Sequence, residues 1–106
     1  MKILALEEDL PGVGRNRFGP LAKAEASRLW ELYLEGLVRE AFFRADRKSA
    51  VLVIEAPTID DARAALDTLP FVREELIRFR LIPLVPYTGF ARLFASQEPS
   101  PRGQRG

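Results

Sequence analysis

The chain has 106 residues, of which 47% are hydrophobic and 29% charged, so we expect one globular domain with a single core. It contains neither Cys nor His, which excludes disulfides, thiolate nucleophiles, Cys/His metal sites and catalytic triads that use a His base. The 16 basic residues nearly balance the 15 acidic ones, which argues against nucleic-acid binding.

The first half of the chain predicts a strand, a loop and a helix. Residues 2–8 form a short apolar run that ends in acidic residues, and a Pro-Gly turn follows, as is typical of a strand. This apolar run is too short for a signal peptide, and no run is long enough to span a membrane, so we expect a cytoplasmic protein. After a loop over 11–19, Pro20 suits a helix start and Gly36 a left-handed helix end. The apolar residues between them recur at helical spacing and are expected to be buried: Ala22, Ala26, Leu29, Trp30 and Tyr33.

The second half predicts a hairpin, a helix and a last strand. Segments 38–45 and 50–56 are rich in Val, Ile and Phe, and the polar residues between them indicate a hairpin turn. Thr58 with Asp61 resembles a capping box at the start of a helix that ends before Pro70. A further helical turn is expected over 71–76, followed by a strand over 77–84.

This βαββαβ order predicts an α+β, ferredoxin-like fold, with a four-stranded antiparallel sheet and two helices on one face. The domain is expected to cover residues 1–94, with an aromatic C-terminal arm over 85–94 that packs either across a subunit interface or back onto its own helices. Residues 95–106, rich in Pro, Gly and Arg, are expected to be a disordered tail.

Strand alternation divides the predicted sheet into two faces. The helix-packed face is expected to carry apolar residues: Leu4, Leu6, Ala41, Phe43, Ala45, Ala50, Leu52, Ile54, Phe79 and Leu81. The other face is mixed: Ile3, Ala5, Glu7, Glu40, Phe42, Arg44, Val51, Val53, Glu55, Arg78, Arg80 and Ile82. This second face is too apolar for a monomer in water, so we expect a second subunit to pack sheet to sheet and enclose a lumen.

Glu40 and Glu55 are the candidate catalytic residues, because the predicted hairpin places them opposite each other. In a desolvated lumen, like charges would raise the pKa of one of them, giving an acid and a base side by side, with Arg44 or Arg80 holding an anion. A turn of different length would instead place Arg39 opposite Glu55 as an ordinary ion pair. No spacing of carboxylates predicts a metal site.

The order and spacing of several short motifs give the chain a family resemblance. They are Leu10-Pro11, Leu34-Glu35-Gly36, Val38-Arg39, Glu55-Ala56-Pro57-Thr58, Leu66-Asp67-Thr68-Leu69-Pro70-Phe71 and Ile82-Pro83-Leu84. Together they resemble the muconolactone isomerase-like group of dimeric α+β barrel proteins over residues 1–94. The related YciI-like branch uses a His-Asp pair, which this chain cannot supply because it has no His.

The resemblance implies dimers or rings of dimers and, in the isomerases, proton transfer on an unsaturated lactone without any cofactor. Arg39 is the one polar position that it matches. With Phe42, Arg44 and Arg80, Arg39 completes the expected binding set for a small organic acid or lactone.

Three functions remain open at the level of sequence. The first is an isomerase or lyase that works by proton transfer. The second is a cofactor-independent monooxygenase, with Trp30 or Tyr87 beside an aromatic substrate. The third is a non-catalytic protein of the same fold that binds a small ligand or supports an assembly.

Overall fold

The computed structural model describes residues 1–95, so the predicted tail lies almost entirely outside the described residues. The strands are β1 (Lys2–Asp9), β2 (Val38–Phe43), β3 (Ala50–Glu55) and β4 (Ile77–Leu84). The helices are α1 (Ala22–Leu34), α2 (Ile59–Leu66) and the single turn α3 (Pro70–Arg73). Three short 3₁₀ segments complete the order: η1 (Arg15–Arg17), η2 (Gly19–Leu21) and η3 (Gly89–Phe94).

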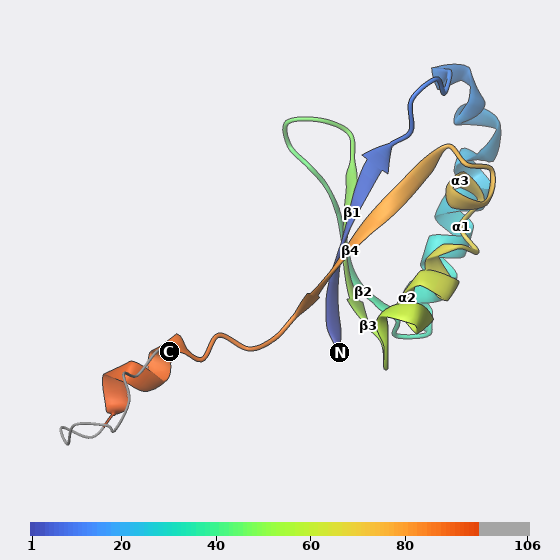
Figure 1. Ribbon diagram of the computed structural model, residues 1–106. Helices are drawn as coiled ribbons and strands as arrows, with labels where there is room; N and C mark the ends of the chain where they lie inside the picture. Colours follow the sequence, from blue (N-terminus) through green and yellow to red (C-terminus); the bar gives the residue numbers. More distant parts are fainter. Residues whose placement is uncertain (96–106) are drawn as a thin grey trace.

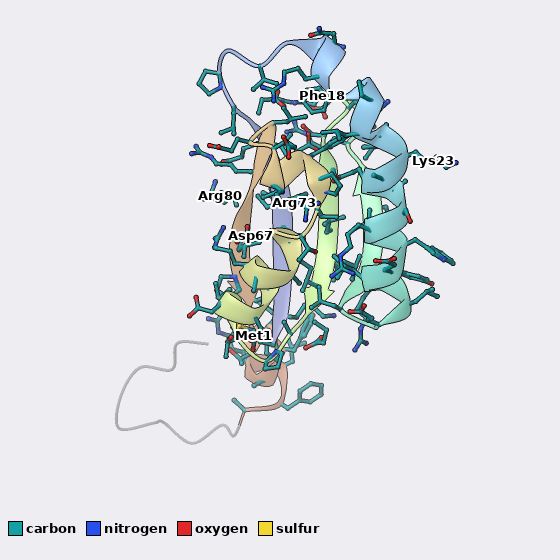
Figure 2. All side chains as sticks on the ribbon, turned by 90° about the vertical axis from the view of Figure 1, so that its right-hand side faces the viewer. Met1, Phe18, Lys23, Asp67, Arg73 and Arg80 are labelled. Atoms are coloured by element: carbon teal, nitrogen blue, oxygen red, sulfur yellow. The ribbon has the colours of Figure 1, made fainter. Side chains whose placement is uncertain are left out.

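The four strands form one antiparallel sheet in the order β2-β3-β1-β4. Figure 1 shows all three helices on one side of this sheet, and Figure 2 views the molecule from that side, with the helices in front of the strands. The expected ferredoxin-like α+β fold is therefore confirmed. The opposite face of the sheet, which we call the open face, is covered by no helix in the part of the chain that the structure describes.

Helix α1 ends where the sequence indicates, but its apolar residues are rotated away from the expected side. Gly36 has a φ of +85°, and its N–H and that of the next residue bond back to the last helical turn, as in a Schellman motif. Leu32 is 1% exposed, whereas Trp30 is 58% and Tyr33 48% exposed. The expectation that Trp30 and Tyr33 lie in the core was wrong, since their rings stack on each other at the surface with centroids 5.3 Å apart.

The second helical region follows its local signals closely. The Thr58 hydroxyl accepts a hydrogen bond from the Asp61 N–H at 3.0 Å, which caps α2. Pro70 occupies the first turn of α3, which is the further turn expected after α2. These two helices place Leu66 and Leu69 in the core, where both are buried.

The two faces of β1 are the reverse of the expectation. Ile3 and Ala5 are fully buried under the helices, where they pair with Ile54 and Leu52 of β3. Leu4 and Leu6 therefore lie on the open face, because successive residues of a strand point to opposite faces. Alternation alone could not decide this orientation, because both faces of β1 carry large apolar side chains.

The β2–β3 hairpin also differs from the expected register. Phe42 pairs with Val51 and Glu40 with Val53, two residues away from the predicted partners. The register shifts between Val38 and Glu40, which leaves Arg39 as an extra residue in β2. Because β2 ends at Phe43, Ala45 lies in the turn and does not pack on the helices as expected.

Of the helix-packed residues expected on β2, Ala41 and Phe43 keep that face but are exposed at the edge of the sheet. The expectations for β4 are confirmed, since Phe79 is buried and Arg80 pairs with Leu6 of the open face. The longest helix, α1, has 13 residues, and no helix within residues 1–95 is long and apolar enough to cross a membrane.

The burial of Ile3 gives a direct test of the corrected face of β1. We expect Ile3→Ala to lower the free energy of unfolding by about 2–5 kcal/mol, because it leaves a cavity under the helices. Lys2→Ala, on the neighbouring exposed position, should cost well under half as much. Urea unfolding followed by circular dichroism measures both, and equal losses would contradict the assignment.

Candidate functional site

A cavity of about 990 Å³ lies between the helix layer and the sheet. It is at the end of the sheet where β1 finishes and β3 and β4 begin, and α1, η1, η2 and α3 contribute to its walls. Phe18, which Figure 2 labels at this end of the molecule, packs edge-on against Phe71 with ring centroids 5.0 Å apart. Most of the remaining wall is apolar, including Leu29, Leu52 and Phe79. A volume of this size and a mainly apolar wall are typical of small-molecule sites.

Glu25 projects into this cavity from the first turn of α1. One of its carboxylate oxygens, Oε1, accepts a hydrogen bond from the backbone N–H of Phe71 at 2.8 Å. Burial raises the pKa of Glu25, and the negative charge of Glu7 raises it further, while the Phe71 N–H acts in the opposite direction. This contact also joins α1 to the start of α3, so the carboxylate has a fixed position.

Glu7 enters the same cavity from β1, on the face that carries Ile3 and Ala5. Its Oε1 accepts the backbone N–H of Ala50, the first residue of β3, at 2.8 Å. The pKa of Glu7 is also raised, first by burial and then by the charge of Asp9, against the lowering effects of the Ala50 N–H and Arg47.

The raised pKa values carry a cost in stability at neutral pH. Because the folded state favours the protonated form of Glu7 and Glu25, their contribution to stability is fully present below the ordinary glutamate pKa of 4.5. It is lost as the pH rises through the folded pKa values. A fold that keeps two such carboxyls in an apolar cavity is the usual pattern at sites of acid-base chemistry.

Three cationic side chains also line the cavity: Arg15, Arg47 and Lys48. Arg47, in the β2–β3 turn, forms an ion pair with Asp9 at the end of β1, with nitrogen and oxygen 2.9 Å apart. Both partners are largely exposed, and the Lys48 ammonium lies 5.6 Å from the centre of the Phe43 ring. These cations can therefore hold an anionic group in the cavity that Glu7 and Glu25 also line.

The candidate residues named from the sequence lie elsewhere, on or near the open face. Glu40 pairs with Val53, and Glu55 pairs with Lys2 of β1, so the two carboxylates are not opposite each other. Glu55 binds the terminal amine of Met1 at 2.9 Å, and that hydrogen bond lowers the pKa of Glu55. The raised pKa expected for this pair is therefore not found on Glu55.

The expected binding residues are also separated from the cavity. The Arg44 Nε donates to Asp46 at 2.9 Å within the exposed turn, and Arg39 donates to the carbonyl oxygen of Gly36. Phe42 is 55% exposed on β2, and Arg80 lies across the sheet on β4. The cavity brings none of these six residues together, and their role in catalysis or binding stays a prediction.

Sequence reasoning missed Glu7 and Glu25, although each carried a signal. Glu25 precedes Leu29 by four residues and Leu32 by seven, so it lies on the buried stripe of α1. Glu7 follows Ile3 and Ala5 in strict alternation and was assigned to the mixed face with them. An acidic residue on each buried stripe was the available sign of an internal site.

A second hollow, of about 370 Å³, lies between α1 and the start of α3 around Arg28. The Arg28 Nε donates to the Thr68 hydroxyl at 2.8 Å, and one terminal nitrogen binds Glu31 at the same distance. Because the guanidinium already has these partners, we interpret this hollow as a helix-packing contact.

Comparison with known proteins supports the fold. No protein-family model matches the chain, and neither does any curated protein sequence. Among solved structures, muconolactone isomerase superposes with a TM-score of 0.68 at 17% identity, over 96% of this chain and 100% of that one. The chain has the fold of muconolactone isomerase. The expected resemblance to dimeric α+β barrel proteins is thus confirmed as a structural match.

A second enzyme of the same fold matches as well. It is 5-chloro-2-hydroxyhydroquinone dehydrochlorinase from Burkholderia phenoliruptrix, solved in complex with 2,5-dihydroxybenzoquinone. Its TM-score is 0.65 at 16% identity, over 84% of this chain and 98% of that chain.

The coupling of the two cavity carboxyls can be measured directly. In Glu7→Gln, we expect the pKa of Glu25 to fall, because a like charge is removed, but to stay above the ordinary Glu value because burial remains. Carboxyl ¹³C NMR titration follows this group. Glu8→Gln is the matched control, since Glu8 points to the opposite face of β1 and pairs with Arg78. An unchanged Glu25 titration in Glu7→Gln would contradict the shared site.

Proposed function

We propose that this protein is a small-molecule isomerase or lyase that transfers a proton without a cofactor in the cavity between helices and sheet. The observation that carries the proposal is the pair Glu7 and Glu25, two half-buried carboxyls with raised pKa values in one mainly apolar cavity. A general acid or base works best when its pKa lies near the working pH, and burial moves both groups in that direction.

The geometry supports complementary roles for the two carboxyls. In each, Oε1 is held by a backbone N–H, and Oε2 has no hydrogen-bond partner among the described residues, so it can face a ligand. One carboxylate removes a proton from a carbon next to a carbonyl group, and the electron pair of that C–H bond shifts into a new double bond. The other carboxyl, in its protonated form, returns a proton at the far end of the conjugated system. Bonds and charges balance without any oxidant or metal.

The charges at the cavity favour a substrate that carries an acidic group. Arg15, Arg47 and Lys48 provide cations near the surface, and Asp9 offsets part of the charge of Arg47. A small carboxylate or enolate would bind there with its reactive carbon toward Glu7 and Glu25.

The named functions of the two structural neighbours are compatible with this chemistry. By their names, one is an isomerase of a lactone and the other a dehydrochlorinase of a hydroxyhydroquinone, and the second was solved with 2,5-dihydroxybenzoquinone bound. Identities of 16% and 17% establish the fold alone, so the choice of reaction rests on the cavity itself.

We further propose that the functional unit is a homodimer, as expected from the sequence. The open face presents large apolar side chains to solvent, among them Leu4, Leu6, Val51, Val53, Ile82 and Phe42. The helices occupy the other side, so a second sheet is the natural cover. In that dimer Glu40 and Glu55 would face the subunit interface, and their catalytic role remains an alternative to that of Glu7 and Glu25. A cytoplasmic location stays a prediction.

Exchange of substrate hydrogen for solvent deuterium tests the proposed chemistry. NMR of a panel of unsaturated lactones and 2-oxo acids in D₂O should show deuterium entering at least one of them when the protein is added. Glu7→Gln and Glu25→Gln should each lower that rate by about a hundredfold or more, because each removes a group that carries the proton.

The matched controls are Glu40→Gln and Glu8→Gln, which change carboxylates outside the cavity. Both should retain the exchange rate of the unaltered protein. Loss of exchange in Glu40→Gln, with normal rates in Glu7→Gln and Glu25→Gln, would indicate that the catalytic site lies on the open face. Binding of a panel compound without exchange in any of them would indicate a non-catalytic binding protein instead.

A further inference from the structure

The turn between β2 and β3, residues 44–49, carries a cation that is already bound to a carboxylate at the cavity. Arg47 and Asp9 both line the cavity and form an ion pair there, with a guanidinium nitrogen 2.9 Å from Oδ2. Of the three cations in the cavity wall, only Arg47 has a carboxylate partner within residues 1–95. The fold itself therefore shows where a carboxylate group can bind.

The turn holds Arg47 in this position through its own hydrogen bonds. The Ser49 N–H donates to the Arg47 carbonyl oxygen at 2.8 Å, and the Arg44 N–H donates to the Ser49 carbonyl oxygen at 2.9 Å. Arg44, the other arginine of the turn, binds Asp46 with two guanidinium nitrogens. Arg47, not Arg44, thus reaches a partner outside the turn.

The same turn is anchored beside a cavity carboxylate. Glu7 accepts the N–H of Ala50, the residue directly after the turn, at 2.8 Å. Regular pairing of β1 with β4 continues through Asp9, so Glu7 and Asp9 point to the same face. Two residues of a strand span about 6.6 Å, so the anion that Arg47 binds lies on the order of 7 Å from Glu7 along β1. One small molecule can contact both groups at this spacing.

Asp9 is a replaceable partner for Arg47. The Arg47 side chain is 50% exposed and that of Asp9 67%, and water competes for both, so the partners of such a pair exchange at low cost. The structure gives one hydrogen bond between them, from a terminal nitrogen of Arg47. A ligand carboxylate that is free to choose its orientation can form two parallel N–H···O bonds with a guanidinium, which are stronger.

We propose that Arg47 selects the substrate by binding a carboxylate group on it, and that Asp9 occupies this position in the free protein. The inference rests on the proposed function and adds to it the residue that recognises the acidic group of the substrate. Asp9 is then an internal competitor that the ligand displaces. Uncharged small rings gain nothing from Arg47 and should be poorer ligands.

The affinities of the full-length protein for benzoate and for benzamide, its uncharged analogue, test this exchange by isothermal titration calorimetry. The unaltered protein should bind benzoate about tenfold more tightly than benzamide. Arg47→Gln should weaken benzoate binding by about tenfold and leave benzamide binding within about twofold. Asp9→Asn should tighten benzoate binding by about threefold, because the competing carboxylate is removed.

The double variant Asp9→Asn/Arg47→Gln separates displacement from a general effect of charge. If Asp9 acts by occupying Arg47, its removal should have little effect once Arg47 is absent, so the double variant should match Arg47→Gln within about twofold. The matched control is Arg78→Gln, which removes a cation from an ion pair with Glu8 on the open face. This variant should bind benzoate like the unaltered protein.

The inference is overturned by equal binding of benzoate and benzamide, by unchanged benzoate affinity in Arg47→Gln, or by no benzoate binding at all. An equal gain from Asp9→Asn with and without Arg47 would also overturn it, since Asp9 would then act only through its charge. All these affinities are measured without turnover. They therefore decide the role of Arg47 separately from the deuterium-exchange assay, which tests Glu7 and Glu25.

Discussion

The orientation of β1 is the constraint on which the rest of the structure depends. This strand is central in the sheet, between β3 and β4, and its alternation sends Ile3 and Ala5 under the helices. The same alternation sends Glu7 into the space between the layers. A carboxylate in that position is costly at neutral pH, and the Ala50 N–H compensates for only part of the lost hydration. The strand that completes the core is therefore also the strand that places an ionisable group inside it.

The two faces of the sheet separate two tasks. On the helix side lies a cavity that brings together Glu7 and Glu25, which are 18 residues apart in sequence. Each carboxylate is fixed by one backbone N–H. On the open side, apolar side chains remain exposed, as expected of a surface that meets a second copy. In this account chemistry takes place within each protomer, and assembly uses the opposite face. Assembly alone therefore explains why the open face is apolar, and no catalytic role is needed for that face.

Local chemistry made the order of the elements predictable. Gly36 ends α1 with a positive φ, Thr58 caps α2 and Pro70 starts α3, and each of these signals acts within a few residues. The faces of β1 and the rotation of α1 were not predictable in this way. Leu4 and Ile3 are similarly apolar, and Leu32 is buried while Leu34 on the same helix is exposed, so the choice was made by tertiary packing. The turn between β2 and β3 likewise moved Glu40 two residues from its expected partner, and the extra residue at Arg39 shifted only the pairing of Val38 beyond it.

The central claim is that ligands bind between the helices and the sheet. The most direct test is ¹H–¹⁵N shift mapping while an unsaturated lactone that carries a carboxylate is titrated into the labelled protein. The account predicts the largest changes at the amides of Ala50 and Phe71, which donate to the two cavity carboxylates. Changes confined to the amides of Glu40, Val53 and Glu55 on the open face, with Ala50 and Phe71 unaffected, would contradict it.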